Sequence, residues 1–298
     1  MNTKIIHIYI LLSISLIAFT QDDLEALMEE EMGEETEYAI ATFLSTRVVN
    51  CHSVEIMPKN GQDFRIAHRF GQFNTGFGEF FGLDESNSYI SAEYGLTKWM
   101  MLGVGRATYK KIFNGFVKPV ILRQSTGKKF MPVSVVVYSS MAVNSTIYEE
   151  KVRNEDFVSR ISYTDQLIIG RKFTPRFSLQ VIPTFVHRNL VSTDEENNDI
   201  YAIGIGGRYK IVSRFSFNIE YFKVFGNDID NSFGLKYYDP LSVGVDIQAG
   251  GHVFQLHLTN ALPMTENTYI GETSGDFFKG DIRFGFNISQ VFTLGKNK

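Results

Sequence analysis

Nine charged residues fall on one side of a series of segments in which apolar and polar residues alternate. Six are cations and three are carboxylates: Arg65, Arg69, Glu93, Lys118, Arg208, Lys210, Glu220, Asp246 and Arg283. If they surround an open passage, the excess of cations predicts a weak preference for anions. If they surround a filled interior, we expect them to pair and brace it, because an unpaired buried charge costs on the order of several kcal/mol. The residue types leave both interpretations open.

Histidine and cysteine offer little material for catalysis or metal binding. Beyond His7, five histidines lie on different segments without the close spacing typical of a metal site: His52, His68, His187, His252 and His257. A serine near His257 could act as the nucleophile of a lipid hydrolase with His257 as its base, but no nucleophile-elbow sequence is present. Cys51 is the only cysteine, so an internal disulfide is impossible and a passive role is expected. We predict no catalytic residues, no metal and no cofactor.

The first 37 residues precede any alternating pattern. Lys4 is followed by an apolar run from Ile5 to Phe19, which is typical of a signal peptide over residues 1–20 that is cut before Gln21. A retained membrane anchor is the alternative, although about 20 apolar residues are needed to span a bilayer. Residues 21–37 contain nine acidic residues and no Lys or Arg, which predicts a flexible acidic arm. A basic partner or Ca²⁺ bound to this arm is the functional alternative.

From about residue 64 the chain repeats segments of about ten residues with apolar residues at every second position. In the segment 215–221, for example, Phe215, Phe217, Ile219 and Tyr221 alternate with polar residues. Period-two alternation predicts β-strands. Twelve such segments begin near residues 64, 88, 98, 114, 132, 158, 176, 200, 214, 240, 252 and 281. The fold class predicted is a closed, antiparallel transmembrane β-barrel of about 12 strands.

Long and short connections alternate between most of these segments. The long ones are residues 71–88, 144–156, 188–199, 226–238 and 261–280, with a shorter sixth at 109–113. Short turns at one rim and long loops at the other are typical of outer-membrane barrels, and an even strand number places both ends of the barrel on the periplasmic side. A soluble β-sandwich or periplasmic barrel, which shares the alternation, is the alternative. The predicted organisation is therefore a signal peptide (1–20), the arm (21–37), a periplasmic segment leading into the barrel (38–63) and the barrel (64–298).

Two charged residues do not fit the alternation. Arg106 is in phase with Met100, Leu102 and Val104, and Asp165 is in phase with the apolar residues around it. Both would face lipid unless a bulge or the headgroup region receives them.

Several motifs resemble an uncharacterised outer-membrane β-barrel family of Bacteroidota. They are ATFLSTRVVNCHSVE at residues 41–55, DFRIAHRFG at 63–71, EYGLT at 93–97 and GVGRA at 103–107. The resemblance covers most of the chain after residue 37 and implies a barrel in the outer membrane, without any assigned activity. Cys51 stands where the resemblance leads us to expect a small residue such as Gly, which argues against a redox role.

These patterns predict location and architecture more closely than activity. Outer-membrane lipid and the barrel assembly machinery are the expected partners, the latter because Phe292 closes the last strand, and no nucleic acid is expected. The function predicted is a narrow passive channel for small solutes with weak anion preference. A non-conducting structural or partner-binding barrel is the alternative, and a lipid-modifying outer-membrane enzyme is the third.

Overall fold

Twelve antiparallel strands close into one barrel. The computed structural model describes residues 35–146, 156–191, 196–226 and 236–293, so the expected signal peptide and nearly all of the acidic arm lie outside it. The strands are β2 (Gly61–Gln72), β3 (Ser86–Thr97), β4 (Met100–Ala107), β5 (Ile112–Leu122), β7 (Ser134–Asn144), β8 (Ile161–Lys172), β9 (Phe177–Arg188), β10 (Asp199–Val212), β11 (Phe215–Phe225), β12 (Leu241–Ala249), β13 (His252–Thr259) and β14 (Arg283–Thr293). Each pairs with its neighbours along the chain, and β14 pairs with β2 to close the ring. The predicted fold class and strand number are confirmed.

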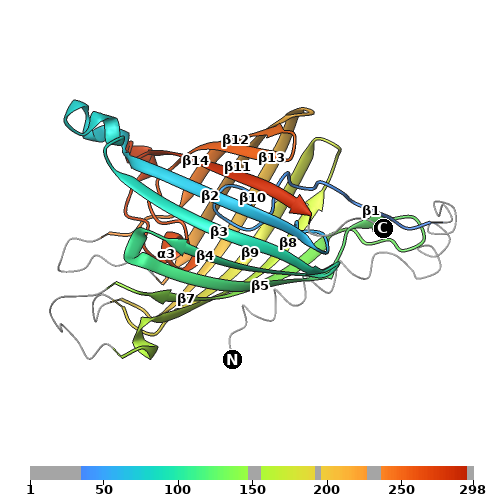
Figure 1. Cartoon of the computed structure of the whole chain (residues 1–298), viewed down its shortest axis with the longest axis horizontal. Helices are drawn as coiled ribbons and strands as arrows, with labels where there is room; N and C mark the ends of the chain where they lie inside the picture. The colour runs from blue at the N-terminus through green and yellow to red at the C-terminus, as the bar shows by residue number, and fades with distance from the viewer. Residues whose placement is uncertain (1–34, 147–155, 192–195, 227–235, 294–298) are drawn as a thin grey trace, which may run out of the picture.

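The observed strand starts differ from the predicted ones by three residues at most, as at Gly61 and Ile161. Turns at one rim are short, with two residues each at 98–99, 213–214 and 250–251. We call this rim the short-turn end and the other the long-loop end; Figure 1 shows them at the right and left of the barrel.

The remaining elements lie at the two rims or inside the barrel. A small sheet at the short-turn end pairs β1 (Glu37–Tyr38) with β6 (Ser125–Thr126). The helical turns are η1 (Phe73–Thr75), η2 (Phe77–Gly82), η3 (Tyr109–Lys111), η4 (Val158–Arg160), α3 (Glu266–Gly271) and η5 (Phe277–Lys279). Within the described residues, no helix combines the length and apolar character that a membrane-spanning helix requires.

Alternation along the strands gives the barrel two different faces. Outward side chains such as Ile203, Ile205, Phe217 and Ile219 are exposed, as expected of a surface that meets lipid. Inward positions are buried, which a wide aqueous lumen would not produce.

Two inward glycines make room for large rings inside the barrel. A Cβ atom at Gly103 would lie 2.2 Å from Phe116, and one at Gly204 would lie 2.4 Å from Phe222. Interior packing therefore requires glycine at these strand positions.

Two segments fill the barrel interior. The first is residues 42–57, which we call the lumen plug; the blue trace between β1 and β2 follows it inside the ring of strands (Figure 1). The second is residues 260–273, which we call the lumen loop; it folds inward between β13 and β14 and contains α3, whose residues are all buried. The segment 38–63, expected to lie in the periplasm before the barrel, therefore needs correction. Its central part lies within the barrel, and its last three residues already belong to β2.

Candidate functional site

The lumen plug is a short hairpin. Arg47 and His52 form an antiparallel bridge, and the Val48 amide donates to the Cys51 carbonyl at 2.9 Å. These bonds satisfy few of the backbone groups at the tip, residues 48–51. The others need partners from the barrel wall, because an unpaired buried backbone group is costly.

The carboxylate of Glu220, on β11, binds the plug tip. It accepts hydrogen bonds from the amides of Val49 (3.1 Å), Asn50 (2.9 Å) and Cys51 (3.0 Å). Three consecutive amides directed at one carboxylate make an anion nest formed within a single chain. Glu220 therefore holds the plug by backbone contacts that do not depend on the plug's side chains.

Side-chain amides of the wall bind carbonyl groups of the tip and of His52, the residue after it. Three donate: Gln255 Nε2 to the Val48 carbonyl (2.9 Å), Asn287 Nδ2 to the Val49 carbonyl (3.1 Å) and Gln180 Nε2 to the His52 carbonyl (2.8 Å). These amides come from β13, β14 and β9, so the plug tip is bound from several sides of the barrel.

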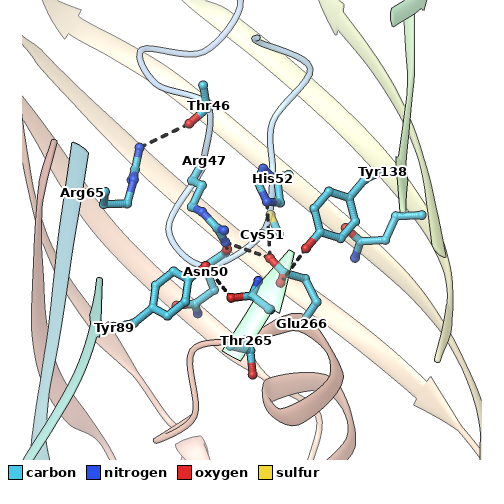
Figure 2. A network of polar contacts seen from close by, with 12 residues as sticks. Thr46, Arg47, Asn50, Cys51, His52, Arg65, Tyr89, Tyr138, Thr265 and Glu266 are labelled. Carbon is cyan, nitrogen blue, oxygen red and sulfur yellow. Dashed lines mark hydrogen bonds and ion pairs between the residues drawn. The ribbon is translucent and has the colours of Figure 1, made fainter. Parts of the chain in front are cut away.

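An ionic network joins the plug to the lumen loop (Figure 2). Glu266 is the first residue of α3, and its Oε1 accepts a hydrogen bond from Arg47 Nη1 at 2.8 Å. Tyr138, on β7, donates to the other oxygen of Glu266 at 2.8 Å. Arg47 also lies 3.7 Å from Glu93. Glu266 therefore connects the plug, the lumen loop and the barrel wall at one point.

His52 lies beside this network. Its ring packs between Phe116 and Tyr138, with centroid distances of 4.7 and 4.3 Å, and its Nε2 is 3.6 Å from Glu266. Burial, followed by the charge of Arg47 and other nearby cations, lowers the pKa of His52 well below its usual value. His52 is therefore neutral in this packing.

Cys51 is fully buried at the plug tip. Burial and the adjacent Glu220 carboxylate raise the pKa of its thiol well above the usual value. A protonated, inaccessible thiol is a poor nucleophile, so the expected passive role fits the geometry.

The nine charged residues singled out in the sequence occupy three kinds of place. Six contact the plug or the lumen loop: Arg65 (Ser45), Arg69 (carbonyls of Ala261 and Pro263), Glu93 (Thr46), Lys118 (carbonyls of Thr46 and Glu55), Arg208 (carbonyl of Thr42) and Glu220. Asp246 accepts from Gln255 of the wall, and Arg283 contacts Glu85. Lys210 is only half-buried. The contacts match the bracing interpretation rather than an open passage.

An apolar core lies beside the polar contacts, and alternation did not predict it. Phe43, Val48, Cys51, Val54 and Met57 of the plug pack against inward residues of the wall and lumen loop. These include Met101, Phe116, Val136, Ile168, Ile182, Val186, Ile200, Phe222, Val224, Tyr269 and Ile270. Each fully buried apolar side chain of this size favours the filled state by roughly 1.5–3 kcal/mol. The barrel interior therefore resembles the core of a soluble domain.

The plug leaves a recess at the short-turn end. A hollow of about 400 Å³ there is lined by residues that include Glu55, Lys59, Lys98 and Arg123. The Arg123 guanidinium stacks 4.8 Å from the ring of Tyr38. The recess is thus more basic than acidic, and it lies where the acidic arm joins the described chain.

The described residues form no group of three or more potential metal ligands. His257, the residue considered for hydrolysis, is buried with its Nε2 3.5 Å from Arg69 Nε.

A family model described as a membrane-bound β-barrel domain (DUF5777) matches residues 43–292. No curated protein matches the chain. Similar solved structures include the NanC porin, with TM-score 0.49, 10% identity and coverage of 77% of this chain and 98% of that chain. The KdgM porin has TM-score 0.44, 11% identity and coverage of 78% and 99%. Omp33 of Acinetobacter baumannii has TM-score 0.39, 10% identity and coverage of 78% and 99%.

Proposed function

The chain belongs to the family of membrane-bound β-barrel domains DUF5777, and we propose that it is an outer-membrane barrel kept non-conducting by its own lumen plug. The observation that carries this proposal is that the barrel interior is filled. Residues 42–57 and 260–273 occupy it, and a continuous apolar core joins them to the wall.

The charged residues support a closed barrel for a second reason. A pore that uses charged side chains to select ions needs those charges to be available to passing ions. Here Lys118 donates to the carbonyls of Thr46 and Glu55, and Arg69 donates to carbonyls of the lumen loop. These cations already have partners within the chain, so the structural or partner-binding alternative fits better than the passive channel.

We propose an orientation with the short-turn end in the periplasm. An exported chain with long loops at one rim has those loops outside the cell. The start of β2 and the end of β14 both lie at the short-turn end, where Gly61 pairs with Thr293. β1, which follows the acidic arm in the chain, lies at this end near the basic recess, and we propose that a basic periplasmic partner binds the arm.

Conductance in planar bilayers tests the closed barrel. We expect no channel events from the refolded wild-type protein, and steady events from a variant whose residues 42–57 are replaced by a flexible Gly/Ser linker of equal length. The shift in gel mobility between unboiled and boiled samples reports that each barrel has folded. Steady wild-type conductance would refute the proposal.

Passage of small solutes after the plug leaves is the second candidate. One observation favours it: every barrel strand is hydrogen-bonded to two other barrel strands, so the ring closes without the plug. In the linker variant, cations that lose their plug contacts, such as Arg65 and Lys118, should give an anion preference. Changing both to Glu should move the reversal potential toward cations, and an unchanged value would exclude them as determinants.

We propose no enzymatic activity. Hydrolysis of detergent-dispersed phospholipid by the wild-type protein, lost on His257→Ala, would revive the lipid-hydrolase alternative.

A further inference from the structure

Two charged side chains project from the outer surface of the barrel, and neither has an opposite charge near it among the described residues. Asp165 on β8 accepts a hydrogen bond from Ser139 at 2.6 Å, and Arg106 on β4 lies over the ring of Phe113 at 5.2 Å. Both are exposed on the surface that meets lipid. A charge in this position is destabilising, and most so near the middle of the bilayer.

The two charges lie at nearly the same depth. Arg106 is six residues from Met100, where β4 begins at the short-turn end, and Asp165 is seven residues from Lys172, where β8 ends at that rim. At about 3.3 Å per residue and a tilt of about 40°, these spacings correspond to heights of about 15 and 18 Å. Both heights are smaller than the roughly 25 Å of an apolar band that begins at this rim.

Other charged side chains on the outer surface have an ion-pair partner within the same chain. Lys223 lies 3.0 Å from Asp239, and Asp199 lies 2.5 Å from His187. Arg171 has no acidic partner in the described part of the chain either; it is one residue from the end of β8 at the short-turn end, and Arg106 is one residue from Ala107, where β4 ends at the long-loop end. Arg106 and Asp165 are thus two outward charges of opposite sign that lie at similar heights above the short-turn end.

The surfaces around them have complementary shapes. Beside Asp165 is a hollow of about 410 Å³, lined mainly by Val137, Leu167, Pro183, Phe185 and Tyr201. Pro183 has no amide hydrogen, and the pairing of β8 with β9 is interrupted opposite it.

Beside Arg106 the surface projects instead. Val104 is 64% exposed and Phe113 is 50% exposed, both on the same side of the barrel. We call the surface of Val104, Arg106 and Phe113 the arginine face, and the hollow with Asp165 the aspartate face.

We propose that the arginine face of one copy packs against the aspartate face of a second copy, so that Arg106 neutralises Asp165 within the membrane. The two faces differ, so the contact is head-to-tail. In the ring order β4, β5, β7, β8 the faces are three strand positions apart out of twelve, which is a quarter of the circumference. Contacts at this angle close into a ring of about four copies.

Cysteine cross-linking in intact outer membranes tests the contact. Replacing Cys51, the only cysteine, with Ser gives a background without thiols. In that background, Val104→Cys and Leu167→Cys on one chain leave both charges in place. Mild oxidation should then give a ladder of covalent oligomers on boiled gels, and neither single cysteine should give one. Monomers alone from the double variant, or dimers from a single variant, would overturn the head-to-tail contact.

Charge reversal separates a specific ion pair from chance collision. Arg106→Glu or Asp165→Arg should each reduce the cross-linked fraction at least about tenfold, and the two together should restore it. Arg171→Glu is the matched control and should change little. Equal loss in the double reversal would show that lipid headgroups, rather than a second copy, neutralise these charges, and the unboiled gel shift confirms that every variant is folded.

Discussion

Removing the Glu220 carboxylate should release the plug tip. Glu220→Ala takes away the acceptor for three amides, those of Val49, Asn50 and Cys51. Each hydrogen bond to a charged group contributes about 1.5–3 kcal/mol, but the three share one carboxylate and water refills the space, so we expect a net loss of about 3 kcal/mol. The population with a displaced plug should then rise about a hundredfold.

Cys51 gives a direct assay of this displacement. It is 0% exposed and the only thiol in the chain, so labelling by a maleimide requires the plug tip to leave its site. The labelling rate should rise about a hundredfold in Glu220→Ala. Because loss of the Glu220 charge also lowers the thiol pKa, trypsin cleavage after buried Arg47 serves as a second readout that does not depend on the thiol.

Asp246→Asn is the matched control. Asp246 is an equally buried wall carboxylate, but it accepts from Gln255 rather than from the plug backbone. If Glu220→Ala and Asp246→Asn give the same labelling and cleavage rates, the assignment of Glu220 as the main plug contact is wrong.

Three further results are expected from the same structure. Glu266→Gln, which weakens the link to Arg47, should raise Cys51 labelling by about tenfold, whereas Tyr138→Phe, which removes one hydrogen bond, should raise it less. Acidification should loosen the plug, because burial lowers the pKa of His52 when the plug is in place. Below about pH 6.5 the displaced state therefore binds a proton that the closed state does not, and the population with a displaced plug should increase by up to about tenfold per pH unit. A disulfide-exchange reagent that reacts at low pH would measure this, and His52→Asn should remove the dependence. Gly204→Val should lower the yield of heat-modifiable barrel on gels because its Cβ would lie 2.4 Å from Phe222, whereas Gly251→Ala, in the β12–β13 turn, should change it much less because its Cβ would lie 3.7 Å from the nearest atom.

The barrel strands were predictable because each strand is specified by the residue pattern of its own segment. Alternation in segments such as Phe215–Phe225 specifies a strand and its two faces without reference to the rest of the chain. The same alternation placed Arg65, Glu93 and Glu220 on the inward side of their strands, where they are buried.

The plug was not predictable because its partners are distant. Arg47 and Glu266 are 219 residues apart, and the plug's own sequence has no regular period. One signal was present in the strands themselves. Segments such as 135–138 and 167–169 are apolar at consecutive positions, and strands that are apolar on both faces indicate a buried interior as well as a lipid-facing exterior.

The two lumen segments are attached to the two strands that close the ring. The plug leads into β2 through residues 58–60, and the lumen loop leads into β14 through residues 274–282, while β2 pairs with β14. Both ends of the plug lie at the short-turn end, so no part of it passes through the barrel from rim to rim. During assembly the interior can therefore be occupied while the β2–β14 seam is still open, and zipping that seam completes the wall around contents already in place. A chain built in this order would never expose the bilayer to an unoccupied pore.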